Sequence, residues 1–245
     1  NMEFKIKETG GTFIDIGASF WGSSPTPSTT MLGSGKQSLL LECDERKYQQ
    51  LLGVAGNLNN ISISNERANP DNIVAILEAN LDLADGNIDI LKVDIDGYDY
   101  YILDSILQKY KPNVINCEFN EKIPPPILFK VFYDKDYSWD TSHFYGMSLC
   151  SVYELCLKHG YKLLELEDEG TNVFLGRADL YTDAPDLKPK DIYDLNDVMN
   201  KPWNTNTMHF HNKPPEEAIV EINKLFSELG FENKYEIGIS EEYTI

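Results

Sequence analysis

Two aspartates lie at and just beyond the end of a strongly apolar strand-like segment of this chain. Residues 88–94 read IDILKVD, a run typical of a strand buried in a sheet, and Asp96 and Gly97 come within three residues of its end. Asp94 and Asp96 are two residues apart, so a regular strand carries both side chains on one face. Ligands of open α/β sheets bind beyond the carboxyl ends of the strands, where carboxylates can orient a substrate or accept its proton.

Three further apolar segments, 11–16, 38–42 and 114–118, also end in polar or small residues. Those residues are Asp15, Gly17, Ala18 and Ser19, then Glu42, and finally Glu118 and Asn120. Gly17 lacks a Cβ, so its backbone can approach a ligand closely. Glu42 lies 25 residues after Gly17, near the spacing of about 20 at which an acid accepts hydrogen bonds from a ribose. The alternative for Glu42 is a solvated acid at a strand end.

The polar side chains at these strand ends converge if the strands are neighbours in the sheet. Like charges that are buried together need a proton, a lysine or a cation to relieve their repulsion. Lys92 shares a strand face with Asp94 and supplies one explanation. The other is a divalent cation such as Mg²⁺, held by the oxygen ligands of Asp94, Asp96, Glu118 and Asn120. Both explanations stay open from the sequence.

Strand-like segments alternate with helix-like segments through most of the chain. The predicted strands are 11–16, 38–42, 61–64, 88–94, 114–118, 161–166 and 172–176. The predicted helices are 29–32, 45–52, 70–81, 98–110, 148–159 and 214–229, of which the fifth begins at Ser148 and ends before Gly160. This order predicts an α/β fold with a Rossmann-like, doubly wound, mostly parallel sheet, whose last two strands form a C-terminal antiparallel hairpin.

Two segments lie outside that alternation. Residues 120–146 are a Pro- and aromatic-rich insertion, too long for an ordinary connection and typical of a lid over a binding site. Beyond residue 179 the chain becomes polar before the helix 214–229. The sequence therefore predicts one domain at 1–179, with the lid insertion at 120–146, and a C-terminal helical extension at 180–245. The extension either caps the substrate site or builds a homo-oligomer.

Composition narrows the range of partners. The formal net charge is −19 and no basic patch interrupts it, which argues against a nucleic-acid substrate. No stretch approaches the roughly 20 apolar residues of a membrane helix, and the first residues lack the apolar centre of a signal peptide. The cysteines have no CxxC spacing and favour buried free thiols in a reducing compartment. We expect a cytoplasmic protein that acts on a small molecule, with no nucleic acid and no membrane as partner.

Several of these segments together resemble a known family. They are FIDIGA, LLLECDERKYQQL, LKVDIDGYDYYIL, VINCEFN and, after the insertion, YGMSLCSVYELCLKHGYKLLELEDEGTNVFL. In this order they are similar to the class I S-adenosylmethionine-dependent methyltransferases, and more narrowly to a methyltransferase-like subgroup of the FkbM-type branch. The resemblance covers roughly residues 11–179. It implies S-adenosylmethionine as the cofactor and, as the residues that contact it, Asp15, Gly17, Ala18, Ser19, Glu42, Asn65, Glu66 and Asp94.

Methyl transfer to oxygen needs an aligned hydroxyl group and a base that removes its proton. His143 is the first candidate for this base, because histidine titrates near neutral pH and this one lies in the predicted lid; the alternative is an exposed bystander. Asp96 is the second candidate. Asp94 and Asp96 can also orient the acceptor, directly or through a metal. The resemblance suggests a hydroxyl group of a sugar or glycan precursor as the acceptor, and therefore O-methylation.

Two other functions stay open from the sequence. The turn after Gly17 reads GASFWGSS, with the bulky Phe20 and Trp21 where a methyltransferase usually has further glycines. The chain can therefore instead be a catalytically inactive, methyltransferase-like binding or scaffold protein. A glycine turn with a ribose-binding acid also serves nucleotide-cofactor oxidoreductases, but the GxGxxG turn of that class is absent. The oxidoreductase has the least support of the three.

Overall fold

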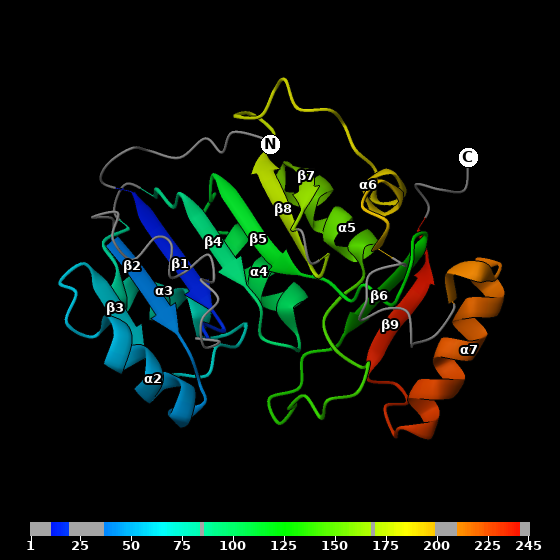
Figure 1. The fold of residues 1–245 in the computed structure, drawn as a ribbon, viewed down its shortest axis with the longest axis horizontal. Coiled ribbons are helices and arrows are strands. Elements are labelled where there is room, and N and C mark those ends of the chain that lie inside the picture. Colours follow the sequence, from blue (N-terminus) through cyan, green and yellow to red (C-terminus); the bar gives the residue numbers. More distant parts are fainter. Residues whose placement is uncertain (1–10, 20–36, 84–85, 168–169, 199–209, 241–245) are drawn as a thin grey trace. The chain divides into compact units, whose positions relative to one another are not determined.

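The computed structural model describes residues 11–19, 37–83, 86–167, 170–198 and 210–240 (Figure 1). The predicted helix 29–32 and the residues Phe20 and Trp21 lie outside these ranges. By its internal contacts, the chain divides into two compact units. The first consists of Asn1–Ile95 and Tyr101–Asn116, and the second consists of Asp96–Tyr100 and Cys117–Ile245. Each unit is described by itself.

Seven of the strands are ordered in one sheet (Figure 1). Its order is β3 (Ile61–Ser64), β2 (Gln37–Leu41), β1 (Thr12–Ile16), β4 (Ile90–Val93), β5 (Val114–Glu118), β8 (Asn172–Arg177) and β7 (Tyr161–Leu166). The first five strands follow the 3-2-1-4-5 order of a doubly wound nucleotide-binding sheet. Strands β7 and β8 pair antiparallel as the predicted hairpin. The Rossmann-like, mostly parallel α/β fold is therefore confirmed.

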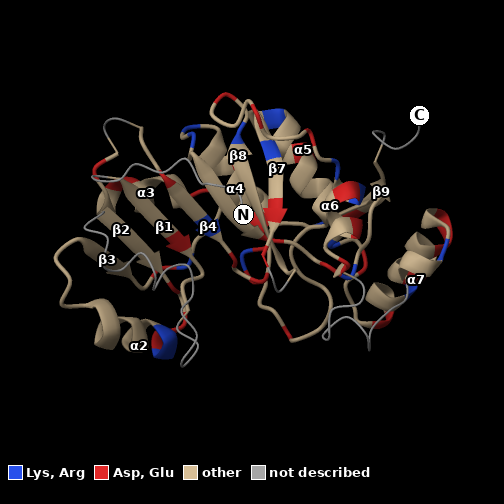
Figure 2. Ribbon diagram, turned by 45° about the horizontal axis from the view of Figure 1, so that its top comes forward, with Lys and Arg blue, Asp and Glu red and all other residues tan. Residues whose placement is uncertain are grey.

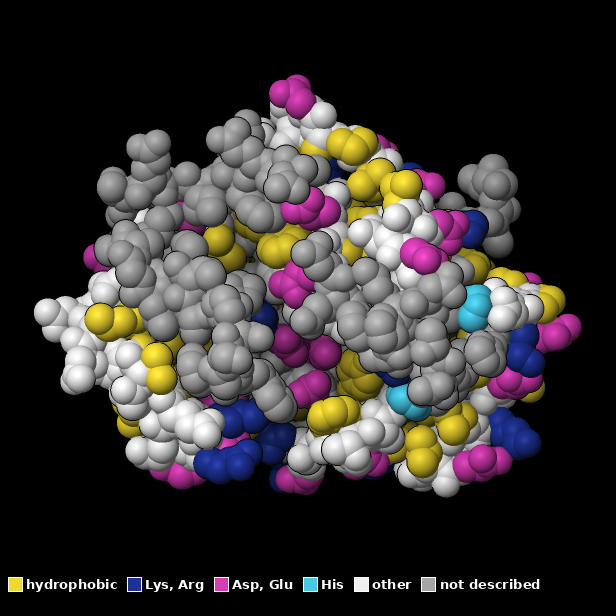
Figure 3. All heavy atoms as spheres, viewed as in Figure 1, with side chains coloured by type: hydrophobic (Ala, Val, Ile, Leu, Met, Phe, Trp, Pro, Cys, Tyr) yellow, Lys and Arg dark blue, Asp and Glu magenta, His cyan; other side chains and the backbone are white. Residues whose placement is uncertain are grey.

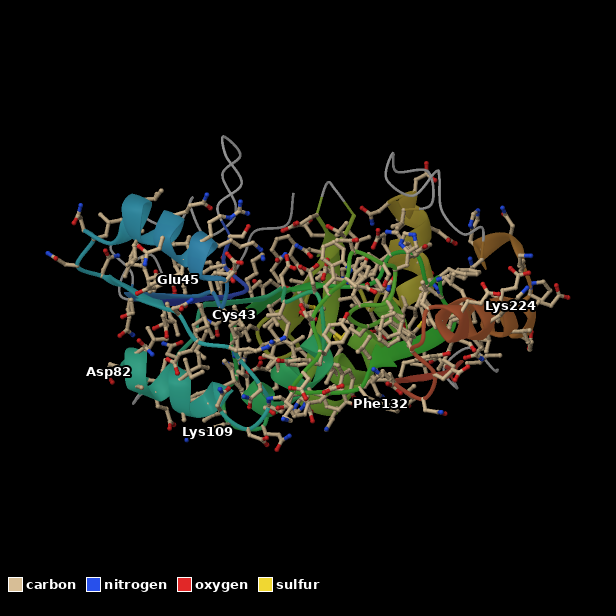
Figure 4. The ribbon with its side chains drawn as sticks, turned by 90° about the horizontal axis from the view of Figure 1, so that it is seen from below. Cys43, Glu45, Asp82, Lys109, Phe132 and Lys224 are labelled. Atoms are coloured by element: carbon tan, nitrogen blue, oxygen red, sulfur yellow. The ribbon has the colours of Figure 1, made fainter. Side chains whose placement is uncertain are left out.

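Helices of the first unit cover both faces of its part of the sheet. Figure 4 shows α2 (Glu45–Ala55), which Glu45 begins, on one face and α3 (Ile73–Asn80) on the other. Asp44 caps α2 by accepting a hydrogen bond of 2.9 Å from the Lys47 N–H, which satisfies one of the free amides of the first turn. The helix α4 (Asp99–Leu107) follows β4. These helices connect parallel strands, as the alternating sequence pattern predicts.

The helix α5 (Leu149–His159) of the second unit has the ends that the sequence predicts. The Ser148 side chain accepts a hydrogen bond from the Ser151 N–H, and Gly160 closes the helix with a left-handed φ of 78°. Glycine adopts this conformation without the steric cost that a Cβ imposes. The helix α6 (Pro189–Leu195) and the short 3-10 helix η2 (Phe210–Asn212) are additional elements that the sequence pattern did not predict.

A second, two-stranded sheet changes the interpretation of the segment 120–146. Within it, β6 (Ile127–Val131) pairs antiparallel with β9 (Tyr235–Ile239) from the C-terminal extension. The helix α7 (Pro215–Glu228) lies beside this sheet (Figure 1) and confirms the predicted helix 214–229. Phe129, Phe144 and Phe226 share one apolar core there. Part of the expected lid is thus a core strand, because Ile127, Phe129 and Val131 alternate into that core.

The domain boundary expected near residue 179 stays a prediction, and the compact units of the structure are drawn elsewhere. Segment 120–146 and the extension belong to one unit because β6 and β9 pair and share a core with α7. Within the described part of the chain, no helix has the length and apolar character that crossing a bilayer requires. All four cysteines are free thiols, but only Cys117, Cys150 and Cys156 are buried. Cys43 is exposed, contrary to expectation, because it lies two residues beyond the end of β2 (Figure 4).

Candidate functional site

The strand register of the first unit brings several predicted cofactor residues into one row. Parallel pairing sets Ile16 opposite both Leu41 and Val93, and it sets Leu41 opposite Ser64. The next residues along these four strands therefore lie just beyond the same edge of the sheet. They are Gly17 after β1, Glu42 after β2, Asn65 after β3 and Asp94 after β4. This carboxyl edge is where doubly wound sheets bind ligands.

Gly17 makes a turn that a residue with a side chain cannot make without distortion. Its φ is +83°, and a Cβ built on it lies 1.8 Å from the carbonyl oxygen of Asp94. The N–H groups of Gly17 and Ala18 both donate to the Leu41 carbonyl, at 2.9 and 3.0 Å. The sequence predicted a glycine for close approach to a ligand, but its closest neighbour is the backbone at the end of β4. Ala18 is buried and Ser19 is half-buried directly after this turn.

Glu42 is a buried carboxylate with one oxygen already engaged. The residue is only 5% exposed, and its Oε1 accepts a hydrogen bond of 2.6 Å from the Asp44 N–H. Burial raises the pKa of Glu42 above its ordinary value, and the hydrogen bond from Asp44 opposes this rise. Glu42 is therefore not the solvated acid that the sequence left open. A carboxylate held in this way can accept hydrogen bonds from a ligand's hydroxyl groups.

Asn65 and Glu66 hold the neighbouring strand end. The Asn65 amide donates a hydrogen bond of 2.8 Å to the Glu42 carbonyl, and Glu66 accepts one of 2.7 Å from the Ser64 hydroxyl. Both residues are exposed. The structure thus brings them to the same edge as Glu42, where Asn65 connects the ends of β2 and β3.

Lys92 lies between two acids of this edge. Its ammonium nitrogen is 2.9 Å from Asp94 Oδ2 and 3.7 Å from Asp15 Oδ1. Asp15 is 1% exposed and Lys92 is 8% exposed, so this is a largely buried group of charges. Figure 2 shows acidic residues at the end of β1. The lysine explanation from the sequence therefore accounts for the repulsion between Asp15 and Asp94.

Asp96 and Glu118 approach each other in the second unit. Each offers a carboxylate oxygen, and these atoms lie within 4.8 Å of one another. Asp96 has a left-handed φ of 53°, which is uncommon for a residue with a side chain. The following residues fix this turn, because the Gly97 N–H donates to Asp99 Oδ2 at 2.9 Å and the Gly97 carbonyl accepts from the Gly146 N–H at 2.8 Å. The turn therefore ties Asp96 to the segment before α5.

Asn120 and His143 are joined through the backbone. The Asn120 amide donates to the carbonyls of His143 and Tyr145, at 2.9 and 3.1 Å, while its oxygen accepts from the Lys122 N–H at 3.3 Å. His143 is half-buried. Burial lowers the pKa of His143, the positive charge of Lys122 lowers it further, and Glu121 raises it. The imidazole is therefore held in the neutral form that can accept a proton.

Glu121 and Tyr145 form a buried pair that the sequence did not single out. Glu121 is 2% exposed, pairs with Lys122 and accepts a hydrogen bond of 2.6 Å from the Tyr145 hydroxyl. Burial raises the pKa of Tyr145 well above its ordinary value, as do the nearby acids Glu121, Glu118 and Asp96. The Tyr193 hydroxyl of α6 donates to the Glu121 carbonyl at 2.7 Å. No local sequence pattern indicates that Glu121 is buried, because Tyr193, which contacts its carbonyl, lies 72 residues away along the chain.

The fold and the polar row define the class of protein to which the chain belongs. A doubly wound sheet with a glycine turn and a buried acid at its carboxyl edge is the architecture of nucleotide-type cofactor domains. Residues 17–138 match the methyltransferase FkbM domain. The chain belongs to the FkbM type of class I S-adenosylmethionine-dependent methyltransferases. This family assignment replaces the oxidoreductase alternative.

Solved structures that share this overall arrangement are distant. An S-adenosylmethionine-dependent methyltransferase from Aquifex aeolicus is 14% identical with a TM-score of 0.36, over 71% of this chain and 85% of that chain. The fibrillarin pre-rRNA processing protein of Methanococcus jannaschii is 12% identical with a TM-score of 0.42, over 71% and 70% of the two chains. Similarity at this level carries no information about the substrate. No curated protein sequence matches the chain significantly.

The Gly17 turn generates a prediction about stability. Gly17→Ala puts a methyl group into the Asp94 carbonyl at a left-handed φ, so we expect it to lower the free energy of unfolding by more than about 1 kcal/mol. Gly53→Ala is the matched control, because nothing lies within 4 Å of a Cβ at this helical position. We expect that control to be neutral or slightly stabilising. Urea denaturation followed by circular dichroism measures both, and equal midpoints for the two variants would show that the contact is not constraining.

Proposed function

We propose that this methyltransferase transfers the methyl group of S-adenosylmethionine to a hydroxyl group of a sugar or glycan precursor. The donor part of the proposal rests on the carboxyl edge of the first unit, and the acceptor part rests on His143 and Asp96. The observation that carries the proposal is Glu42, a buried acid in the row that follows β1 to β4, within a chain of the FkbM type. The resemblance to that branch supports a carbohydrate acceptor.

The donor part of the proposal assigns a role to each residue of the row. The Glu42 carboxylate accepts hydrogen bonds from the two ribose hydroxyls of S-adenosylmethionine, and Oε1 is held in place by the Asp44 N–H. Asn65 and Glu66 border the adenosine, and the Gly17 turn with Ala18 and Ser19 borders the methionine part. Asp15 and Asp94 flank this turn, with Lys92 balancing their charge. Charge at Glu42 is unfavourable for folding but favourable for binding hydroxyl donors.

Glu42→Gln separates these two effects. The amide oxygen of glutamine can still accept from the Asp44 N–H, and the variant removes a charge whose burial is costly, so we expect thermal stability to be equal or higher. We expect the affinity for S-adenosylmethionine to fall by about tenfold or more, because two charge-assisted hydrogen bonds become neutral ones. Isothermal titration calorimetry with S-adenosylmethionine measures the affinity, and differential scanning calorimetry measures the stability.

Glu45→Gln is the control, since it removes the same charge from an exposed position in the first turn of α2 (Figure 4). We expect its cofactor affinity to equal that of the wild type. A Glu42→Gln protein with wild-type affinity would remove the ribose role from Glu42. A wild-type protein that does not bind S-adenosylmethionine at millimolar concentration would contradict the donor site as a whole and would favour the inactive scaffold.

The acceptor part of the proposal uses His143 as the base. A hydroxyl group that attacks the methyl carbon must lose its proton, and a neutral imidazole accepts it. The physical support is the lowered pKa of His143, because the side chain is then neutral throughout the physiological range. Asp96 is the second candidate for this base. Asp94 and Asp96 orient the acceptor hydroxyl.

The pH dependence of the reaction tests this role. Because the pKa of His143 is lowered, the active neutral form persists on acidification, and we expect kcat/KM to fall only below about pH 6.5. His143→Gln should remove this acidic limb and lower kcat by about 10²- to 10⁴-fold. His159→Gln, at the end of α5, is the control and should keep the wild-type profile. An unchanged acidic limb in His143→Gln would move the base role to another group.

A divalent cation is a finer part of the same proposal. Asp96 and Glu118 supply hard oxygen donors close to each other, as Mg²⁺ and Ca²⁺ prefer, and Asp94 lies two residues before Asp96 as a further donor. A bound cation would orient an acceptor hydroxyl and lower its pKa. The Asn120 amide is engaged with the backbone of Lys122, His143 and Tyr145. We therefore assign Asn120 to positioning the His143 segment rather than to the cation.

Metal binding can be measured without the reaction. We expect calorimetric titration of Mg²⁺ or Ca²⁺ into chelator-treated protein to show one saturable site, and Asp96→Asn or Glu118→Gln to weaken it by at least about tenfold. Asp136→Asn, which removes an exposed acid of the second unit, should leave the titration unchanged. Absence of binding at millimolar cation would leave the carboxylates to act on the acceptor directly and would remove the metal from the proposal.

A further inference from the structure

Trp139 presents a large aromatic ring to solvent in the segment between β6 and α5. It is 42% exposed, although tryptophan is usually much more buried. Its only polar atom is already satisfied, because the indole Nε1–H donates a hydrogen bond of 2.8 Å to the Ser142 carbonyl. The exposed part of the side chain is therefore apolar ring surface, and it needs no further hydrogen-bond partner.

The turn that carries Trp139 is built to hold one conformation. Asp140 Oδ1 accepts a hydrogen bond of 2.9 Å from the Ser142 N–H, and the Ser142 hydroxyl accepts one of 3.2 Å from the Phe144 N–H. Thr141 between them has a left-handed φ of 69°, which is unfavourable for a β-branched residue. A strained turn of this kind persists where its surroundings determine it, and such strain is common at ligand-binding segments.

The ring of Trp139 packs against Tyr145, which belongs to the buried Glu121–Tyr145 pair. The rings of Trp139 and Tyr145 meet edge to face, with centroids 6.2 Å apart and an interplanar angle of 72°. Tyr145 is itself fixed by its hydrogen bond to Glu121. The indole is thus locked at its nitrogen and at its ring edge before any ligand arrives. A rigid aromatic side chain of this kind binds a ligand with little loss of conformational entropy.

The charges around this ring select the ligand. The groups that act electrostatically on Tyr137 and Tyr145 are acids, namely Asp96, Asp99, Glu118, Glu121 and Asp140. Figure 3 shows several separate groups of acidic side chains on the face that it draws, and the net charge of the chain is −19. A phosphate group brought here would be repelled, whereas hydroxyl and ammonium groups would find hydrogen-bond acceptors. An apolar ring face beside carboxylates matches a sugar ring, which has an apolar C–H face and a rim of hydroxyl groups.

We propose that Trp139 is the stacking residue for the acceptor and that the acceptor is a sugar ring without phosphate, neutral or amino-substituted. This inference rests on the proposed function and specifies its substrate class. It also gives the segment around residue 139 a role in specificity, since these acids repel a sugar phosphate or nucleotide sugar. Those that are exposed or half-buried, Asp96, Glu118 and Asp140, can accept hydrogen bonds from the hydroxyl rim. A ring that only pinned its own turn would have no effect on acceptor affinity beyond an effect on folding.

Saturation-transfer NMR tests the inference independently of turnover. The probes are the methyl glycosides of glucose, galactose, mannose and glucosamine, compared with glucose 1-phosphate and UDP-glucose, each added to protein saturated with S-adenosylhomocysteine. We expect at least one methyl glycoside to bind with its C–H protons in contact with the protein, and the phosphorylated probes to bind at least about tenfold more weakly. We expect Trp139→Ala to weaken glycoside binding by about tenfold or more and Trp139→Phe to weaken it less.

Phe132→Ala is the matched control, because Phe132 is an aromatic residue of the same unit with a similar exposure of 39% (Figure 4). It should keep the wild-type glycoside affinity. For a glycoside that is methylated, Trp139→Ala should raise KM with kcat within about twofold, as loss of uniform binding requires. Glycoside affinity that Trp139→Ala leaves unchanged, phosphorylated probes that bind equally well, or no bound glycoside would each overturn the inference. Failure to bind S-adenosylhomocysteine would instead contradict the proposed function itself.

Discussion

The contact between Gly17 and the backbone of Asp94 is the constraint on which the carboxyl edge of the first unit depends. The end of β1 passes so close to the end of β4 that a Cβ would lie 1.8 Å from a carbonyl oxygen. The same turn donates two hydrogen bonds to the Leu41 carbonyl and so fixes the end of β2. Because three strand ends are tied together in this way, the residues that follow them form a continuous polar row. A substitution at Gly17 would therefore disturb the ends of β1, β2 and β4.

The second unit is organised around buried hydrogen bonds rather than strand register. Glu121 accepts from Tyr145 through its side chain and from Tyr193 through its carbonyl. Asn120 holds the carbonyls of His143 and Tyr145. The helix α6 therefore supports the segment that carries His143 and Trp139, and the pairing of β6 with β9 anchors the start of the same segment. The C-terminal extension is in this way part of the framework that holds the segment with His143 and Trp139.

The sequence predicted those features that depend on neighbouring residues. The strand before Asp94, the Ser148 cap and the Gly160 stop are encoded in a few consecutive positions, and all are confirmed. Strands β6 and β9 were missed because Ile127 pairs with Ile239, a partner that no local pattern reveals. The burial of Glu121 was missed for the same reason. The register of the parallel sheet explains why the convergence of Gly17, Glu42 and Asp94 at one edge was predictable, since it requires only that the strands end at the same level.

The acids at the carboxyl edge of the first unit differ in how their charge is balanced. Lys92 partly compensates the charges of Asp15 and Asp94, so the three residues form a charge group within the first unit. Glu42 is different, because burial raises its pKa in the folded chain above the value in the unfolded chain. When the pH rises through the unfolded value and then the folded one, the unfolded chain releases its proton first, and the free energy of unfolding falls. The charged form of Glu42 is therefore less favourable for folding than the protonated form. A buried acid whose charged form is costly, in the row where related folds bind a ribose, is the kind of residue that the proposed donor site requires.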